Sequence, residues 1–282
     1  MSQLKISELF YSIQGEGKFM GVPSVFLRTF GCNFTCGGFG MPKGETSLER
    51  ETIAINAKDY TDYKSLPLVS TGCDSYASWD PAFKHLSPVL DTDSIADSIV
   101  GTLPRGRWMD EHLVITGGEP LLGWQRSYPD LLSNEKMRSL QELTFETNGT
   151  QFITKEFGSY LDEWRRNRAK DSVTFSVSPK LSISGEKWED AICPDVVCDY
   201  KQYGFVYLKF VVANKDDVNE AEQAVNEYRK KGFTGPVYIM PVGGTIDTYS
   251  MNARTVAELA MYKGWRYSAR LQCDLFKNDW GT

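Results

Sequence analysis

The sequence has little that points to secretion, to a membrane or to nucleic acid. None of its hydrophobic runs approaches 18 residues, so no transmembrane helix is predicted. Residues 1–11 lack the basic start and the apolar run of a secretory signal. The chain has 31 basic and 37 acidic side chains, and its net charge of −6 gives no indication of a nucleic-acid-binding surface. We therefore expect a soluble, cytoplasmic protein that binds neither membranes nor nucleic acid.

Cysteine and histidine are also scarce, with six cysteines and two histidines in 282 residues. Six cysteines are too few for a disulfide scaffold in a chain of this length. In a reducing compartment they indicate metal binding or catalysis first. Neither His85 nor His112 stands at zinc-ligand spacing from the cysteines, which argues against a structural zinc site.

Strands and helices are predicted to alternate along most of the chain. The predicted strands are residues 22–30, 113–116, 143–146, 173–177, 205–212, 237–240 and 265–272, of which 205–212 is apolar apart from Lys209. The predicted helices are 95–103 capped by Asp93 or Ser94, 153–164, 218–228 closed by Gly232, and a helix around 256–260 ending at Gly264. This alternation predicts an α/β fold with a mainly parallel sheet. No G-x-G-x-x-G follows the first predicted strand, so we expect a partial (β/α)6 barrel in one domain, 1–282, over a dinucleotide-binding fold.

One segment, residues 37–72, interrupts this pattern. It is polar and glycine-containing, and it shows neither helical nor strand periodicity well. Its one apolar cluster is Leu66-Pro67-Leu68-Val69. Long loops are uncommon inside compact domains and are usually functional or disordered. We therefore expect an inserted loop over 37–72.

Three cysteines are expected near the end of the first predicted strand. Cys32 and Cys36 are separated by three residues, and Cys73 follows after the inserted segment. Three thiolates on a four-iron cluster would leave one iron open, as an open position on zinc makes a catalytic site. On spacing alone, two buried free cysteines with an unrelated third, or a structural zinc, remain alternatives. Cys193 and Cys198 supply only two ligands, and we interpret them as ordinary cysteines.

Several other motifs have both a functional and an ordinary interpretation. In Gly117-Gly118-Glu119-Pro120, glycines let the backbone approach a ligand and a carboxylate can pair an ammonium, although the motif could also be a plain loop. The run Gln14-Gly15-Glu16-Gly17 could be a glycine turn with a solvated glutamate. The ordinary alternatives for single residues are a salt bridge from Arg28 to Glu16, a helix N-cap at Ser75 and a solvated side chain at Lys180.

Together these motifs resemble the radical S-adenosylmethionine superfamily. Its usual signature is C-x₃-C-x₂-C after the first barrel strand; here the last gap has expanded to residues 37–72. Within the superfamily the chain resembles the 7-carboxy-7-deazaguanine synthases. That resemblance spans residues 9–272 outside the insertion and is carried by Gln14–Gly17, Gly21, Pro23, Arg28, Glu146–Thr150, Ser178–Lys180 and, loosely, Met240-Pro241.

The resemblance implies a set of cofactors and contacts. Cys32, Cys36 and Cys73 would hold a [4Fe–4S] cluster, and Ser75, where threonine is more usual, would bind Mg²⁺. The implied contacts to S-adenosyl-L-methionine are Gly117, Gly118, Glu119, Ser178, Pro179, Lys180, Met240, Pro241, Val242 and Gly243. The implied substrate contacts are Ile13, Gln14, Gly15, Glu16, Arg28 (to a carboxylate), Thr116, Gln272 and Thr282. No side chain is assigned as catalytic, because the cofactor radical carries the chemistry.

The implied reaction is a radical-mediated ring contraction of 6-carboxy-5,6,7,8-tetrahydropterin to 7-carboxy-7-deazaguanine with loss of ammonia, a carbon–nitrogen lyase step toward queuosine-type deazapurines. The implied partners are a flavodoxin- or ferredoxin-type electron donor and a second copy in a homodimer. A glycyl-radical-enzyme activase and a non-catalytic iron–sulfur interaction module are the alternatives. One departure is the run 270–274, which lacks the family's frequent histidine, so that Gln272 or Asp274 would take its place.

Overall fold

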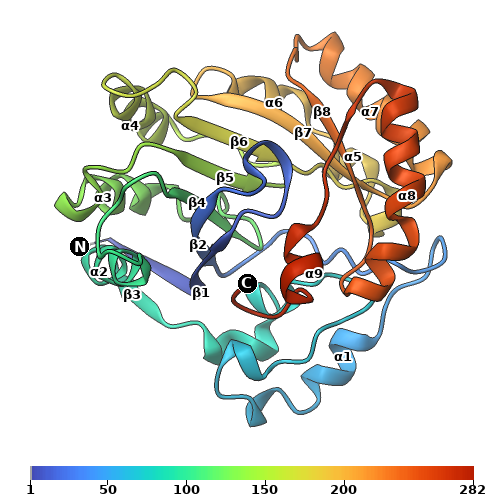
Figure 1. Ribbon diagram of the computed structural model, residues 1–282, viewed down its shortest axis with the longest axis horizontal. Coiled ribbons are helices and arrows are strands. Elements are labelled where there is room, and N and C mark those ends of the chain that lie inside the picture. Colours follow the sequence, from blue (N-terminus) through green and yellow to red (C-terminus); the bar gives the residue numbers. More distant parts are fainter. Residues whose placement is uncertain (1) are drawn as a thin grey trace.

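A single curved sheet organises the computed structural model, which describes residues 2–282 (Figure 1). Its strands are β1 (Gln3–Ile13), β2 (Pro23–Thr29), β3 (Val89–Asp91), β4 (His112–Gly117), β5 (Leu143–Thr147), β6 (Val173–Val177), β7 (Phe205–Val212), β8 (Val237–Pro241) and β9 (Arg266–Tyr267). They lie in the order β3-β1-β2-β4-β5-β6-β7-β8-β9. From β2 to β9 every neighbouring pair is parallel, whereas β1 is antiparallel to both β2 and β3. The predicted α/β class with a mainly parallel sheet is confirmed.

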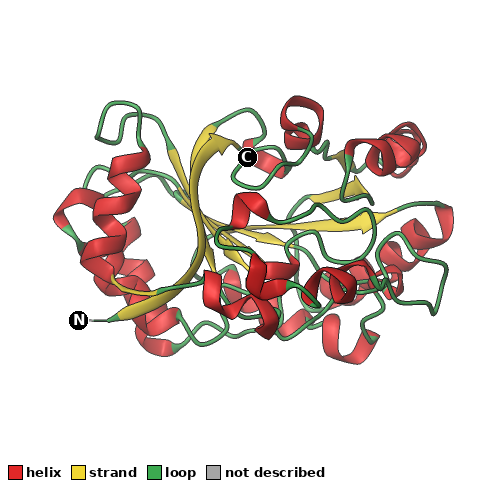
Figure 2. Cartoon of the chain, turned by 90° about the horizontal axis from the view of Figure 1, so that it is seen from below, coloured by secondary structure: helices red, strands yellow, loops and turns green. Residues whose placement is uncertain are grey.

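Helices surround the strands, as Figure 2 shows. They are α1 (Glu49–Ala54), α2 (Thr92–Thr102), α3 (Tyr128–Ser133), α4 (Lys155–Arg165), α5 (Trp188–Ala191), α6 (Pro194–Tyr200), α7 (Lys215–Lys230), α8 (Ile246–Lys263) and α9 (Leu271–Phe276). The predicted helices 153–164 and 218–228 correspond to α4 and α7. Gly264 ends α8 in the left-handed conformation, as predicted. No helix of residues 2–282 combines the length and the apolar character needed to cross a membrane.

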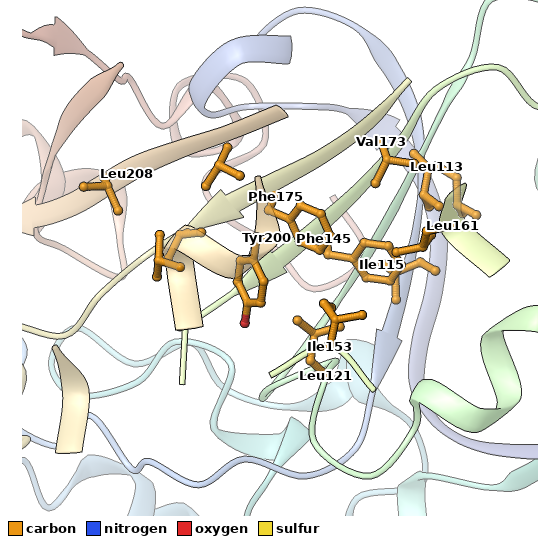
Figure 3. Packing of buried hydrophobic residues seen from close by; sticks show 14 of the residues in the cluster. Leu113, Ile115, Leu121, Phe145, Ile153, Leu161, Val173, Phe175, Tyr200 and Leu208 are labelled. Atoms are coloured by element: carbon orange, nitrogen blue, oxygen red, sulfur yellow. The ribbon is translucent and has the colours of Figure 1, made fainter. Parts of the chain in front are cut away.

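Alternation along the parallel strands separates the hydrophobic core from the interior of the curved sheet. Leu208 and Phe210 on β7 belong to the core, whereas Lys209 between them points the other way and lines a cavity. Figure 3 shows the core aromatic side chains from neighbouring elements in contact. The ring of Phe175 lies 4.7 Å from that of Tyr200, centroid to centroid, in a stacked arrangement. This packing fixes the positions of the strand ends that carry the site.

The N-terminal and C-terminal parts differ from the sequence-based expectation. The strand expected over 22–30 is the second strand of the chain, not the first. The strand before it, β1, was not predicted, because buried and exposed residues do not alternate cleanly along it. The last predicted strand, 265–272, ends at Tyr267, and Leu271 begins α9 instead. The Leu271 N–H donates to the carbonyl of Gly15, a contact with the far end of the chain that local pattern does not reveal. Asp91, not Asp93 or Ser94, caps α2 by accepting from the Ser94 N–H at 2.8 Å.

The inserted segment, residues 37–72, is more ordered than a loop. It contains α1 and contributes Tyr63, Leu66 and Val69 to an apolar cluster with the downstream residues Tyr76 and Phe83. Its apolar residues are spaced irregularly and find their partners elsewhere in the sequence, which is why periodicity missed them. The inserted segment therefore packs onto the part of the chain that follows it.

Candidate active site

A cavity lies at the carboxyl ends of the parallel strands, where parallel α/β folds place their sites. Its walls include Thr116 at the end of β4, Thr147 at the end of β5 and Met240 at the end of β8. The last residues of the chain, 278–282, and part of the inserted segment line the same cavity. In Figure 1 the C-terminus lies near the middle of the view, beside β1.

The three predicted cysteines meet in this cavity. Cys32, Cys36 and Cys73 all line it and share an apolar cluster with Phe34 and Phe39. Burial raises the pKa of the Cys32 thiol to about 12, that of Cys36 well above its usual value, and that of Cys73 as well. Thiols with such pKa values stay protonated at neutral pH unless a metal takes the place of the proton.

The spacing of these sulfurs does not suit one shared ion. Within residues 2–282, no three His, Cys, Asp or Glu side chains are grouped closely enough to hold a single metal ion. A four-iron cluster needs a wider arrangement, because each thiolate binds a different iron. N–H groups point at two of the sulfurs: the Phe34 backbone at Cys32 and the Trp79 indole at Cys73, both at 3.4 Å.

A carboxylate that the sequence did not single out holds the turn between the first two cysteines. Glu186 accepts hydrogen bonds from the backbone N–H of Thr35 at 2.9 Å and of Cys36 at 2.7 Å. Cys36 has a positive φ of 50°, which a non-glycine residue adopts rarely. The two hydrogen bonds offset part of that backbone cost. Glu186 lies far away in sequence, so no local signal could have identified it.

The Gly-Gly-Glu-Pro motif also makes a close contact within the chain. A Cβ on Gly118 would lie 2.4 Å from the carbonyl oxygen of Gly31 and 2.7 Å from Cβ of Cys32. The glycine therefore allows the turn after β4 to pack on the first cysteine, although Gly117 and Gly118 also line the cavity.

Glu119 is fully buried and is not part of the cavity wall. Its carboxylate accepts from the N–H groups of Leu121 at 3.0 Å and Asn148 at 2.6 Å, and from the hydroxyl of Thr147 at 2.7 Å. These hydrogen bonds join the turn after β4 to the turn after β5. The pairing of Glu119 with a ligand ammonium stays a prediction.

A compact group of buried charges occupies another part of the cavity wall. Glu16 accepts from the ammonium of Lys209, from Arg270 at 3.3 Å and from the amide of Gln272 at 2.7 Å. Burial alone would raise the pKa of Glu16, but Lys209 and Arg270 lower it to about 2. The sequence indicated Lys209, because it is the one charged residue inside the apolar run of β7. Nothing in the sequence indicated Arg270.

Arg28 is paired, but not with the residue named as the ordinary alternative. Its Nε donates to Glu8 on β1 at 2.9 Å, whereas Glu16 is bound by Lys209 and Arg270. The Arg28 side chain remains 19% exposed, and it lines the cavity. The two terminal nitrogens of its fork have only a 3.5 Å contact, from Nη1 to the carbonyl of Gly117, within the described chain. Arg28 therefore keeps donors that face the cavity.

The remaining predicted contacts were also located. Gln14 donates to Glu146 at 3.1 Å, and Lys180 donates to the hydroxyl of Ser178 at 3.2 Å. Ser75 stands at the N-cap position of the short 3-10 helix Tyr76–Ser78, but its hydroxyl donates to Asp74 at 3.1 Å and makes no capping bond. Pro179, like Glu119, does not line the cavity. The predicted residues that do are Ile13, Gln14, Gly15, Glu16, Arg28, Cys32, Cys36, Cys73, Ser75, Thr116, Gly117, Gly118, Ser178, Lys180, Met240, Pro241, Val242, Gly243, Gln272 and Thr282.

Comparison with known proteins gives a consistent assignment. No family model matches the chain. The chain is 31% identical to the 7-carboxy-7-deazaguanine synthase of Halobacterium salinarum, over 98% of this chain and 91% of that protein. It is 28% identical to that of Pyrobaculum aerophilum, over 95% and 93%. The crystal structure of QueE from Escherichia coli has the same fold, with a TM-score of 0.55 and 20% identity over 95% of this chain and 93% of that one. The chain therefore belongs to the 7-carboxy-7-deazaguanine synthase family.

Proposed function

We propose that this protein is a radical S-adenosylmethionine lyase that contracts 6-carboxy-5,6,7,8-tetrahydropterin to 7-carboxy-7-deazaguanine with loss of ammonia. The observation that carries the proposal is the convergence of Cys32, Cys36 and Cys73 on one cavity with Arg28, in a chain of this family. The product would enter the biosynthesis of deazapurine nucleosides.

The three cysteines fit a [4Fe–4S] cluster. They are grouped in an apolar setting, burial keeps their thiols protonated at neutral pH unless a metal displaces the proton, and backbone and indole N–H groups point at two sulfurs. The positive charge of Lys180 favours the thiolate form of all three. With S-adenosyl-L-methionine, the cluster supplies the radical that starts the reaction.

The rest of the cavity divides between the two small molecules. We assign Gly117, Gly118, Ser178, Lys180 and the turn Met240–Gly243 to S-adenosylmethionine. The predicted contacts of Glu119 and Pro179 with the cofactor remain part of the proposal, although neither residue lines the cavity.

Arg28 would hold the substrate carboxylate with the nitrogens that Glu8 leaves free, since a guanidinium fork suits a planar carboxylate. Ile13, Gln14, Gly15, Thr116, Gln272 and Thr282 would surround the pterin. Glu16, fixed by three donors, would accept a hydrogen bond from it without moving.

Mg²⁺ is part of the proposal and has a candidate position beside the third cysteine. The Ser75 hydroxyl and the Asp74 carboxylate lie 3.1 Å apart, oxygen to oxygen, and both residues line the cavity. Magnesium takes oxygen ligands, few of them from protein. There it would stabilise negative charge on the reacting substrate. A flavodoxin- or ferredoxin-type donor would supply the electron, and we expect a homodimer.

The test is anaerobic turnover of reconstituted protein. The cluster-loaded enzyme, with S-adenosylmethionine, Mg²⁺, a reductant and 6-carboxytetrahydropterin, should form 7-carboxy-7-deazaguanine, measured by mass spectrometry. A Cys73→Ala variant should form none. Cofactor cleavage without product from the parent enzyme would leave radical chemistry in place and refute the substrate assignment.

A further inference from the structure

The residues around the third cysteine are contacted at two points by the last part of the chain. We call residues 73–76 the Cys73 segment and residues 270–280 the C-terminal segment. Arg270 donates to the carboxylate of Asp74 at 2.6 Å, one residue after Cys73. The ring of Trp280 meets that of Tyr76 edge-on, with centroids 5.5 Å apart and an interplanar angle of 87°. These contacts join parts of the chain that are distant in sequence.

Arg270 is buried, unlike the arginine of an ordinary surface ion pair. Its side chain is only 8% exposed. Besides Asp74, its guanidinium donates to the carbonyl of Gly243 and to Glu16. A planar fork with three partners has one orientation, so Arg270 fixes the Asp74 carboxylate relative to two other parts of the cavity wall.

Trp280 provides the second contact, which is a packing of aromatic rings. Tyr76 is fully buried, and its hydroxyl donates to the carbonyl of Pro67 at 2.8 Å. Trp280 also lies 5.9 Å from the ring of Tyr63 in the inserted segment. The indole thus packs between the Cys73 segment and the inserted segment. Asn278 ties the same stretch to the carbonyl of Gly244 at 2.8 Å.

Cys73 needs such contacts because local backbone geometry does not place it. The whole inserted segment separates it from Cys36, and the ends of that segment are joined by a hydrogen bond from the Gly72 N–H to the carbonyl of Phe39 at 2.7 Å. The position of Cys73 relative to Cys32 and Cys36 must therefore come from tertiary contacts. The indole N–H of Trp79 reaches the Cys73 sulfur itself, but Trp79 lies within the same local stretch. Arg270 and Trp280 link that stretch to another part of the fold.

We propose that Arg270 and Trp280 are positioning residues that hold Cys73 beside Cys32 and Cys36 for cluster assembly, before any cofactor binds. The proposal rests on the proposed function, in which Cys73 is the third cluster ligand. It makes the C-terminal segment a structural part of the iron–sulfur site.

Hydrogen exchange of the cofactor-free protein tests the positioning directly. In Arg270→Gln and Trp280→Leu proteins, peptides covering residues 70–79 should exchange about tenfold faster than in the parent, with peptides from β4 to β7 unchanged. Arg254→Gln is the matched control, because that arginine is 92% exposed on α8. Parental exchange over 70–79 in both variants would overturn the proposal. The variants remove different contacts, so if one fails to fold the other decides.

Iron and sulfide content after reconstitution tests the consequence. Both variants should hold less iron per chain than the parent, approaching the level of Cys73→Ala, and Arg270→Lys should recover part of it. Faster exchange with parental iron content in both variants would overturn the role in cluster assembly. A full cluster in Cys73→Ala would instead refute the ligand assignment of the proposed function, which separates the two failures.

Discussion

The buried carboxylate of Glu16 allows a quantitative prediction. In Glu16→Gln protein, Lys209 and Arg270 keep their charges but lose their shared partner. Breaking a buried ion pair on one side costs about 3–5 kcal/mol. The pKa of Glu16 gives a similar figure: about 2 in the fold against an ordinary 4.5 corresponds to about 3 kcal/mol. We therefore expect the free energy of unfolding to fall by about 3 kcal/mol at pH 7, and the melting temperature by about 6–12 °C.

The same pKa fixes the pH dependence of this difference. Folding lowers the pKa of Glu16, so its stabilisation is complete above the ordinary pKa of 4.5 and is lost as the pH falls toward 2. The parent and the variant should therefore differ most at neutral pH. Near pH 3 the difference in the free energy of unfolding between parent and variant should have fallen by more than half, because Glu16 of the unfolded chain is already protonated there.

The assay is urea unfolding of cofactor-free parent and variant from pH 7 to pH 3. Glu227→Gln serves as the control, since Glu227 forms an exposed pair with Lys230 and should contribute less than about 1 kcal/mol. A loss below about 1 kcal/mol for Glu16→Gln at pH 7 would refute the reasoning. So would a difference between parent and variant that stays constant down to pH 3.

Three further predictions concern other parts of the site and the core. Arg28→Lys keeps the charge but loses the fork, so the KM for the pterin should rise about ten- to a hundredfold while cofactor cleavage persists; an unchanged KM would contradict the carboxylate role. Gly118→Ala places a Cβ 2.4 Å from the carbonyl oxygen of Gly31, and should cost about 1–3 kcal/mol in thermal unfolding and reduce iron content; parental values of both would show that the turn can shift. Burial, with help from the charge of Lys18, lowers the pKa of His112 to about 3. The free energy of unfolding of the parent should therefore fall by about 2 kcal/mol between pH 7 and pH 5, and that of a His112→Gln protein should not. Equal dependence of the unfolding free energy on pH in the two proteins would disprove a buried neutral imidazole.

Local pattern was sufficient for much of the architecture and for most of the residues that line the cavity. The predicted strand bounds 173–177 and 205–212 match β6 and β7, because a buried strand shows itself in a few consecutive residues. The site motifs were equally readable, since each follows a strand and the carboxyl ends of parallel strands meet at one edge. Cys73 is the most instructive case: its flanking residues singled it out despite the insertion, and it lines the cavity with Cys32 and Cys36.

Only the tertiary structure decided which side chains meet. Glu119 follows a strand as predicted, and the structure adds that its carboxylate accepts hydrogen bonds from Leu121, Thr147 and Asn148. Arg270 was expected in a strand, and it instead begins the C-terminal segment that reaches Asp74 and Glu16.

The sequence by itself therefore determined the family, the parallel strands β2 and β4 to β8, and most of the residues that line the cavity. The reason is that periodicity and motifs are local. The ordered insertion, the buried charges and the contacts around Cys73 required the tertiary structure, because each depends on partners far apart in the chain.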